Sequence, residues 1–146
     1  MKIKILHAED DLMFSHMVRS LLEKEGIQVY SAIDGATAWT LFLKEKPDIC
    51  LLDIVMPGIS GIDLGEKIRE VDKQVPIYYL SAECLELVAK EIYGRGGATG
   101  FFNKIRNMNE LSEWLNNLNN KKSHSNGRSF SAWGFSVLRR QKVACL

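Results

Sequence analysis

Polar side chains that could bind a metal ion or act in catalysis follow several apolar runs in this 146-residue chain. The acidic stretch 9–11 (Glu-Asp-Asp) follows one run, Asp53 ends a second, Ser81 follows a third, and Lys104 comes after a fourth. Carboxylates that lie close together repel one another, and one of them takes up a proton unless a cation intervenes. A cluster that offers only oxygen atoms favours a hard ion such as Mg²⁺ or Mn²⁺ over zinc. These residue types therefore predict a magnesium site, provided that the fold brings them together.

The segments between these residues alternate between short apolar runs, typical of strands, and longer stretches with helical spacing. Five strand–helix units in about 120 residues predict an α/β fold, with a doubly wound parallel sheet, helices on both faces and right-handed crossovers. The third predicted strand is apolar at every position before Asp53, which suits a strand that is covered on both faces. The predicted strands are residues 3–8, 28–32, 49–53, 77–80 and 101–102, and the predicted helices are residues 13–24, 36–44, 62–71, 85–93 and 108–118.

In a parallel sheet of this kind, ligands bind at the carboxyl ends of the strands. We expect the strand order 2-1-3-4-5 of a flavodoxin-like sheet, in which the first and third strands are neighbours. Glu9, Asp10 and Asp53 would then converge within a few ångströms. Ser81 and Lys104 would lie at the ends of the next two strands. The placement of all five residues at one edge, rather than any single residue, is the informative signal.

A longer motif surrounds Asp53. The run from Leu51 to Gly58, followed by Gly61, reads Leu-Asp-x-x-Met-Pro-Gly-x-x-Gly from position 52 onward. Together with the acidic stretch 9–11, the Ser-Ala pair at 81–82 and the lysine at 104, it resembles the response-regulator receiver domains of two-component signalling, the CheY-like family. The resemblance covers roughly residues 3–118, and the motif around Asp53 is its most specific part.

The resemblance implies a metal site and a phosphorylation site that share one aspartate. Asp53 corresponds to the phosphoacceptor. Glu9 and Asp10 correspond to the acidic pair that holds Mg²⁺ together with Asp53, and the backbone carbonyl of Val55 would supply a further metal ligand.

The resemblance also implies a switch. Ser81 is similar to the switch hydroxyl, Lys104 to the lysine that contacts the phosphoryl oxygens, and Phe101 occupies the place of an aromatic side chain that reorients on activation. The protein would be a signalling switch rather than an enzyme, although it assists its own phosphoryl transfer and dephosphorylation. Its implied partners are a histidine kinase or phosphotransfer protein, and then a downstream protein target or a second copy in a homodimer.

Three residues depart from the family pattern. Ile105 replaces the proline that usually follows the lysine; a cis bond to a non-proline residue costs about 2.5–4 kcal/mol, so we expect the Lys104–Ile105 peptide to be trans. This leaves open whether Lys104 reaches the site. Phe101 lacks the polar group of the tyrosine or histidine often found at its position, and Val55 places an apolar side chain beside the site.

Alternative interpretations remain open at this point. A phosphorylation-independent interaction module of the same fold (a pseudo-receiver) is favoured by Ile105. An aspartate-dependent phosphatase would usually have a second aspartate where Val55 stands, which argues against that class. The stretch 9–11 could simply cap a helix, Ser81 could be a helix N-cap, and Lys104 could be a solvated surface lysine.

Charge divides the chain into two parts. All 18 acidic residues lie at or before position 113, whereas six of the 19 lysines and arginines follow position 120. We therefore expect a receiver domain over residues 1–120, and a basic linker or tail over residues 121–146 that is a truncated linker, a docking arm or a cloning remnant. The tail is too short for a DNA-binding output domain.

The sequence gives no sign of a membrane segment. No apolar run approaches the roughly 18–20 residues that a bilayer-spanning helix needs. The basic N-terminus reaches the acidic Glu9 too soon to form the apolar core of a signal peptide. We expect a cytoplasmic protein without a membrane partner.

Overall fold

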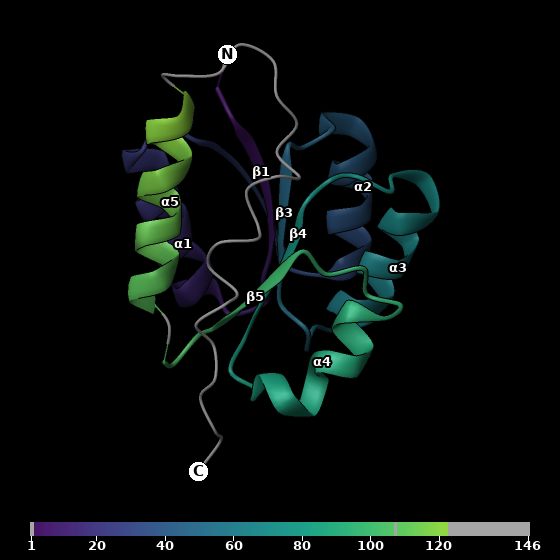
Figure 1. Cartoon of the computed structure of the whole chain (residues 1–146). Coiled ribbons are helices and arrows are strands. Elements are labelled where there is room, and N and C mark those ends of the chain that lie inside the picture. The colour runs from purple at the N-terminus through teal and green to yellow at the C-terminus, as the bar shows by residue number, and fades with distance from the viewer. Residues whose placement is uncertain (1, 107, 123–146) are drawn as a thin grey trace.

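The computed structural model describes residues 2–106 and 108–122 (Figure 1). In this part of the chain, strands and helices alternate as predicted, and Asp53 directly follows its strand instead of ending it. The last helix continues to Lys122, beyond the predicted end at residue 118 and beyond the predicted domain boundary at residue 120. The elements are β1 (Lys4–Ala8), α1 (Leu12–Lys24), β2 (Gln28–Ala32), α2 (Gly35–Glu45), β3 (Ile49–Leu52), α3 (Gly61–Val71), β4 (Ile77–Ser81), α4 (Leu85–Tyr93), β5 (Gly100–Asn103) and α5 (Met108–Lys122).

The five strands form one parallel sheet in the order β2-β1-β3-β4-β5, which confirms the predicted flavodoxin-like, doubly wound topology. Ala8, the last residue of β1, pairs with Leu52, the last residue of β3. The residues that follow these two strands therefore start from adjacent points of the same edge. On the other side of β3, Ser81 at the end of β4 pairs with Asn103 at the end of β5.

Each face of the sheet is covered by its own helices, as Figure 1 shows: α2, α3 and α4 lie on one face and α1 and α5 on the other. The alternation along β3 explains the two cores, because Cys50 and Leu52 point to the first face while Ile49 and Leu51 point to the second. All four side chains are buried. This is the two-sided burial that the unbroken apolar run predicts.

Short polar residues begin three of the helices. The side chains of Asp11, Asp34 and Ser60 accept hydrogen bonds from backbone N–H groups in the first turns of α1, α2 and α3. The capping interpretation is therefore correct for Asp11 within the acidic stretch. It is wrong for Ser81, because the N-cap of α4 is Cys84.

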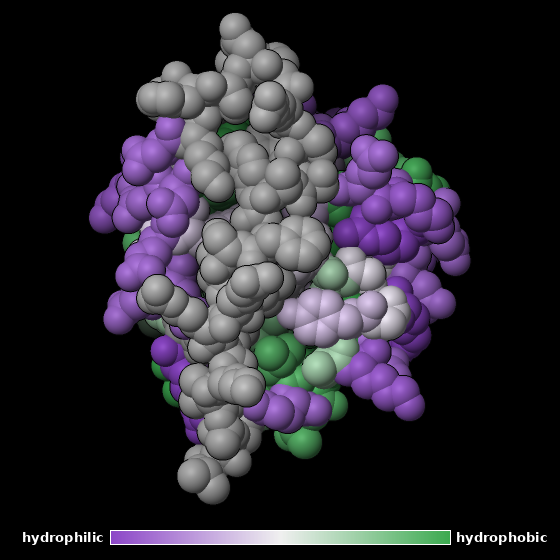
Figure 2. Space-filling view, viewed as in Figure 1, coloured by the Kyte–Doolittle hydropathy of each residue, from purple (hydrophilic) through white to green (hydrophobic). Residues whose placement is uncertain are grey.

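Hydrophilic residues predominate on the outer surfaces of α5, α2 and α3 in the view of Figure 2. Among the described residues, no helix combines the length and the apolar character that crossing a bilayer requires. The predicted tail at 121–146 lies outside the described residues from position 123 onward, so the division of the chain at 120 stays a prediction.

Candidate functional site

Three carboxylates meet at the carboxyl edge of the sheet, where the sequence predicts them. Glu9 and Asp10 follow β1, Asp53 follows β3, and one oxygen from each lies within 4.8 Å of the others. Glu9 and Asp53 are buried, whereas Asp10 is exposed. The cluster therefore reaches the surface through Asp10.

The ammonium group of Lys104 lies among these acids. Its Nζ is 3.1 Å from Asp53 Oδ2 and forms an ion pair with Glu9. It also lies over the ring of Phe14, 4.6 Å from the ring centroid. Since only 14% of the side chain is exposed, the interpretation of Lys104 as a solvated surface lysine is wrong.

Burial and the charges of neighbouring groups shift the pKa values of two ionisable residues in and beside the pocket. Burial raises the pKa of Glu9 to about 7, with the charge of Asp53 adding to the rise and Lys104 opposing it. Burial also lowers the pKa of the neighbouring His7 to about 4, and the charge of Lys104 lowers it further. His7 is therefore neutral at pH 7 and contributes no cation to the site.

The donor set fits the metal that the residue types predict. Glu9, Asp10 and Asp53 offer carboxylate oxygens only, which is the chemistry that Mg²⁺ and Mn²⁺ prefer. Because Asp10 is exposed, an ion held by these residues would be accessible to solvent, and Mg²⁺ usually keeps several water ligands. The predicted role of the Val55 carbonyl as a further ligand stays a prediction; the Val55 side chain is exposed.

Ser81, the last residue of β4, and Phe101, within β5, are both buried. Ser81 Oγ accepts a hydrogen bond from the backbone N–H of Glu83 at 3.2 Å, and the Ser81 carbonyl accepts one from the N–H of Lys104. Phe101 packs in the core under α2, α3 and α4. Their predicted roles as switch residues stay predictions.

Asn103 organises the loop that carries Lys104, and the sequence analysis missed it. The Lys104–Ile105 peptide is trans, as predicted. Asn103 Oδ1 accepts from the N–H groups of Ile105 and Arg106, both at 2.9 Å, while its Nδ2 donates to the Glu83 carbonyl at 3.0 Å. An Asn side chain can replace backbone partners in this way. The feature of the sequence that could have indicated this role is the position of Asn103, directly before Lys104 at the end of a strand.

Steric contact explains why the motif around Asp53 ends in a glycine, Gly61. A Cβ atom on Gly61 would lie 1.7 Å from the backbone oxygen of Asp53, and the Gly61 N–H donates to the Ile54 carbonyl at 2.9 Å. Only glycine permits this approach. The loop 53–61 is thereby folded back against the residue that the site depends on.

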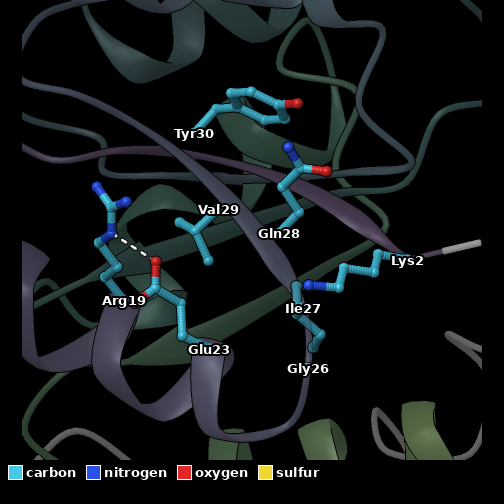
Figure 3. A pocket seen from close by; sticks show the side chains of 8 residues that line it. All are labelled: Lys2, Arg19, Glu23, Gly26, Ile27, Gln28, Val29 and Tyr30. Carbon is cyan, nitrogen blue, oxygen red and sulfur yellow. Dashed lines mark hydrogen bonds and ion pairs between the residues drawn. The ribbon is translucent and has the colours of Figure 1, made fainter.

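A groove of about 660 Å³ lies elsewhere, beside α1 and the amino ends of the first two strands (Figure 3). Its lining includes Lys2, Gln28 and the Arg19–Glu23 ion pair, which Figure 3 marks with a dashed line. It shares no residue with the acidic cluster. Because ligands of parallel sheets bind at the carboxyl ends of the strands, we do not assign the site to this groove.

A five-stranded parallel sheet with an acidic cluster and a lysine at its carboxyl edge defines the CheY-like class of α/β proteins. The family model "Response regulator receiver domain" matches residues 5–116, and the chain belongs to that family. Among solved structures, the chemotaxis response regulator CheY4 of Vibrio cholerae is 28% identical, with a TM-score of 0.73 over 81% of this chain and 99% of that one. The response regulator TrrA of Thermotoga maritima, in complex with Mg²⁺-BeF, is 30% identical, with a TM-score of 0.71 over 81% and 99%.

Two relatives show the range of proteins in which the domain occurs. The transcriptional regulatory protein RprY of Bacteroides fragilis is 32% identical over 76% of this chain and 47% of its own length. The sporulation initiation phosphotransferase F of Bacillus subtilis is 30% identical over 56% of this chain and 66% of its own length. The chain thus spans about half the length of the regulatory relatives that it matches.

Proposed function

We propose that the chain is a phosphoacceptor receiver domain that takes a phosphoryl group on Asp53 with the help of Mg²⁺ and switches a protein-interaction surface. The observation that carries this proposal is the position of Lys104, 3.1 Å from Asp53 beside two further acids. A nucleophilic carboxylate, an oxygen-only donor set and a fixed cation are what phosphoryl transfer to an aspartate needs. The family membership supports the same conclusion.

The residues of the pocket have separate roles in this transfer. An Asp53 oxygen attacks the phosphorus of a phosphohistidine; the O–P bond forms as the P–N bond breaks, and the imidazole nitrogen leaves with the electron pair and is protonated. Lys104 donates to a phosphoryl oxygen and balances its charge. When bound by Glu9, Asp10 and Asp53, Mg²⁺ neutralises the carboxylates and the incoming phosphoryl group.

The donor is a histidine kinase or a phosphotransfer protein in the cytoplasm. Apolar side chains are exposed directly beside the site residues: Leu12 and Met13 follow the acidic stretch, Val55 follows Asp53 by two positions, and Ile105 follows Lys104. Exposed apolar side chains next to charged site residues fit a protein partner better than a small molecule. After phosphorylation, the switched surface would bind a downstream protein or a second copy of the chain.

Binding of beryllofluoride, a phosphoryl mimic, separates this proposal from the pseudo-receiver alternative. Fluorine NMR of the full chain should show a bound beryllofluoride signal that requires both Mg²⁺ and Asp53, so that Asp53→Asn abolishes it. Asp11→Asn is the matched control, because Asp11 is adjacent to the cluster but caps α1. A wild-type chain without a bound signal at saturating Mg²⁺ would favour the pseudo-receiver.

A further inference from the structure

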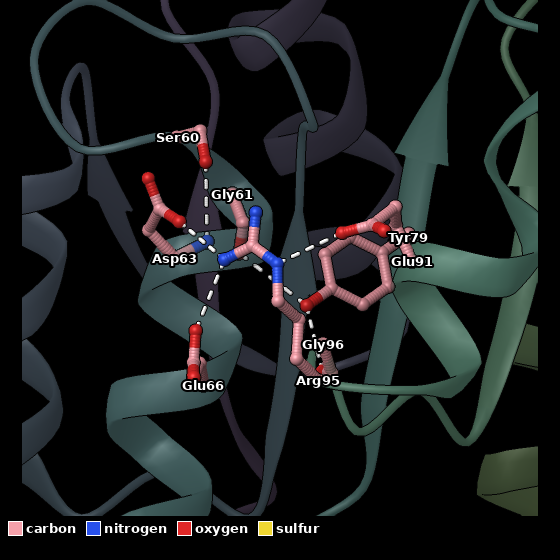
Figure 4. Close-up of polar contacts among 8 residues, drawn as sticks. All are labelled: Ser60, Gly61, Asp63, Glu66, Tyr79, Glu91, Arg95 and Gly96. Carbon is pink, nitrogen blue, oxygen red and sulfur yellow. Dashed lines mark hydrogen bonds and ion pairs between the residues drawn. The ribbon is translucent and has the colours of Figure 1, made fainter.

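The phenol of Tyr79 links two segments that are far apart in the sequence. Tyr79 lies in the middle of β4 and is completely buried. Its hydroxyl contacts the Gly96 carbonyl at 2.7 Å, in the turn after α4, and the Gly61 carbonyl at 3.3 Å, at the start of α3 (Figure 4). A phenol has one hydrogen to donate, so the two carbonyls compete for it, and the shorter contact to Gly96 takes the larger share.

The space around this hydroxyl is left open by glycines. A Cβ atom on Gly65 would lie 1.9 Å from the Tyr79 hydroxyl and 2.6 Å from the Gly96 carbonyl, and a Cβ on Gly96 would lie 2.8 Å from the hydroxyl. Gly61 in turn touches the Asp53 backbone, as described above. Close contacts therefore run without interruption from Asp53 through Gly61 and Tyr79 to Gly96.

Charged side chains bridge the same two segments at the surface. Arg95, next to Gly96, binds Asp63 and Glu66 on α3 and Glu91 on α4 (Figure 4). Arg69 on α3 donates to the Gly97 carbonyl through two nitrogens at 2.8 and 3.0 Å. The Arg95 ion pairs are about half exposed, and ion pairs that are exposed to solvent contribute little stability individually. The strength of the hydrogen bond from the buried phenol is therefore more sensitive to the relative position of the two segments than that of these surface contacts.

We propose that Tyr79 is a positioning residue that transmits the state of Asp53 to the turn between α4 and β5. The inference rests on the function proposed above. Phosphorylation of Asp53 shifts the loop 53–61, the shift moves the Gly61 carbonyl relative to the hydroxyl, and the hydrogen bond to Gly96 strengthens or weakens in response. Tyr79 is the register partner of Phe101 on the adjacent strand, so the residue that carries this hydroxyl is paired with the aromatic residue that lacks one.

The test compares two single-hydroxyl deletions in the full chain. Tyr79→Phe removes the linking hydroxyl, whereas Tyr78→Phe removes a hydroxyl from the adjacent residue, which packs against Phe102 and Trp114 on the opposite face of the sheet. Amide hydrogen exchange is followed at Gly96 and Gly97 with Mg²⁺, with and without beryllofluoride. We expect the exchange rates there to change on beryllofluoride binding in the wild type and in Tyr78→Phe. In Tyr79→Phe, beryllofluoride should still bind at Asp53, but the change at the turn should be lost.

The outcomes separate this inference from the proposed function. If the wild type does not bind beryllofluoride, the proposed function and the inference about Tyr79 are both overturned. If Tyr79→Phe binds beryllofluoride and the turn responds as in the wild type, only the inference is overturned. A purely structural role of Tyr79 would give this result, because loss of the hydroxyl would then lower the stability of the free and the bound protein equally. Should Tyr79→Phe fail to fold, 3-fluorotyrosine labelling replaces it. The Tyr79 fluorine resonance should then shift on beryllofluoride binding while that of Tyr78 does not, and an unshifted Tyr79 resonance overturns the inference.

Discussion

Lys104 Nζ lies 3.1 Å from Asp53 Oδ2, although residue 105 is an isoleucine and the peptide between 104 and 105 is trans. The reach of Lys104 therefore does not depend on a proline in this chain. The side chain of Asn103 holds the loop instead, by accepting two backbone hydrogen bonds just beyond the lysine.

Removing that acceptor should loosen the loop. Asn103→Ala leaves the N–H groups of Ile105 and Arg106 without their acceptor, so we expect faster exchange of both amides and a free energy of unfolding lower by about 1–3 kcal/mol. Hydrogen exchange and urea denaturation measure the two effects. Asn103→Asp keeps the acceptor and should retain the protection; equal exchange in all three proteins would show that Asn103 does not hold the loop.

The charge of Lys104 should matter for ligand binding. Lys104 Nζ lies beside Asp53 and is proposed to donate to a phosphoryl oxygen, and Lys104→Met removes that donor. A hydrogen bond to a charged group is worth about 1.5–3 kcal/mol, so the affinity for Mg²⁺-beryllofluoride should fall roughly 10- to 150-fold. A fluorine NMR titration gives the dissociation constant. Lys90→Met, which removes an exposed lysine from α4, is the control and should bind as the wild type does. An unchanged constant in Lys104→Met would contradict the assigned role.

Two adjacent aspartates should differ in their effect on Mg²⁺. Asp10 belongs to the carboxylate cluster, whereas Asp11 caps α1. Asp10→Asn should weaken Mg²⁺ binding about tenfold or more, since affinity follows the number of charged ligands. Asp11→Asn should have little effect, because asparagine caps a helix as well as aspartate does. Calorimetric titration measures the affinity of each variant for Mg²⁺. Equal losses of affinity in the two variants would show that only the overall charge matters.

Two glycines that follow Asp53, Gly58 in the loop before α3 and Gly61 at the start of α3, should also differ. A methyl group on Gly61 collides with the Asp53 backbone, so Gly61→Ala should lower the free energy of unfolding by about 3 kcal/mol or more. Gly58 has open space around it but a φ of +72°, so Gly58→Ala should cost only about 1–2 kcal/mol. Thermal and urea denaturation test the order, and a Gly58 variant that is the less stable of the two would contradict it.

The sequence predicted the fold well because the strands and helices differ clearly in period and are separated by glycine, proline and capping residues. The run 49–52, which directly precedes Asp53, is apolar at every position and could therefore be placed inside a parallel sheet. Strand order then followed from the fold class, and it brought Glu9, Asp10 and Asp53 to one edge, where the structure has them. Their chemical roles remain predictions.

The contacts that the sequence could not predict are those between side chains and distant backbone. Asn103 meets the Glu83 carbonyl across 20 residues, and Tyr79 meets Gly96 across 17. Neither residue belongs to a motif, and an apolar-looking strand position such as 79 gives no sign that its hydroxyl has a partner. Such contacts depend on the exact approach of segments, which hydrophobic periodicity does not determine.

The most direct test of the central claim is the mass of the intact chain after incubation with acetyl phosphate. With Mg²⁺, the wild type should gain the mass of one phosphoryl group, and the gain should be lost when the metal is chelated or when Asp53 is replaced by alanine. Peptide mapping should place the group on Asp53. A wild-type chain that gains no mass with Mg²⁺, or an Asp53→Ala variant that gains as much as the wild type, would contradict the account.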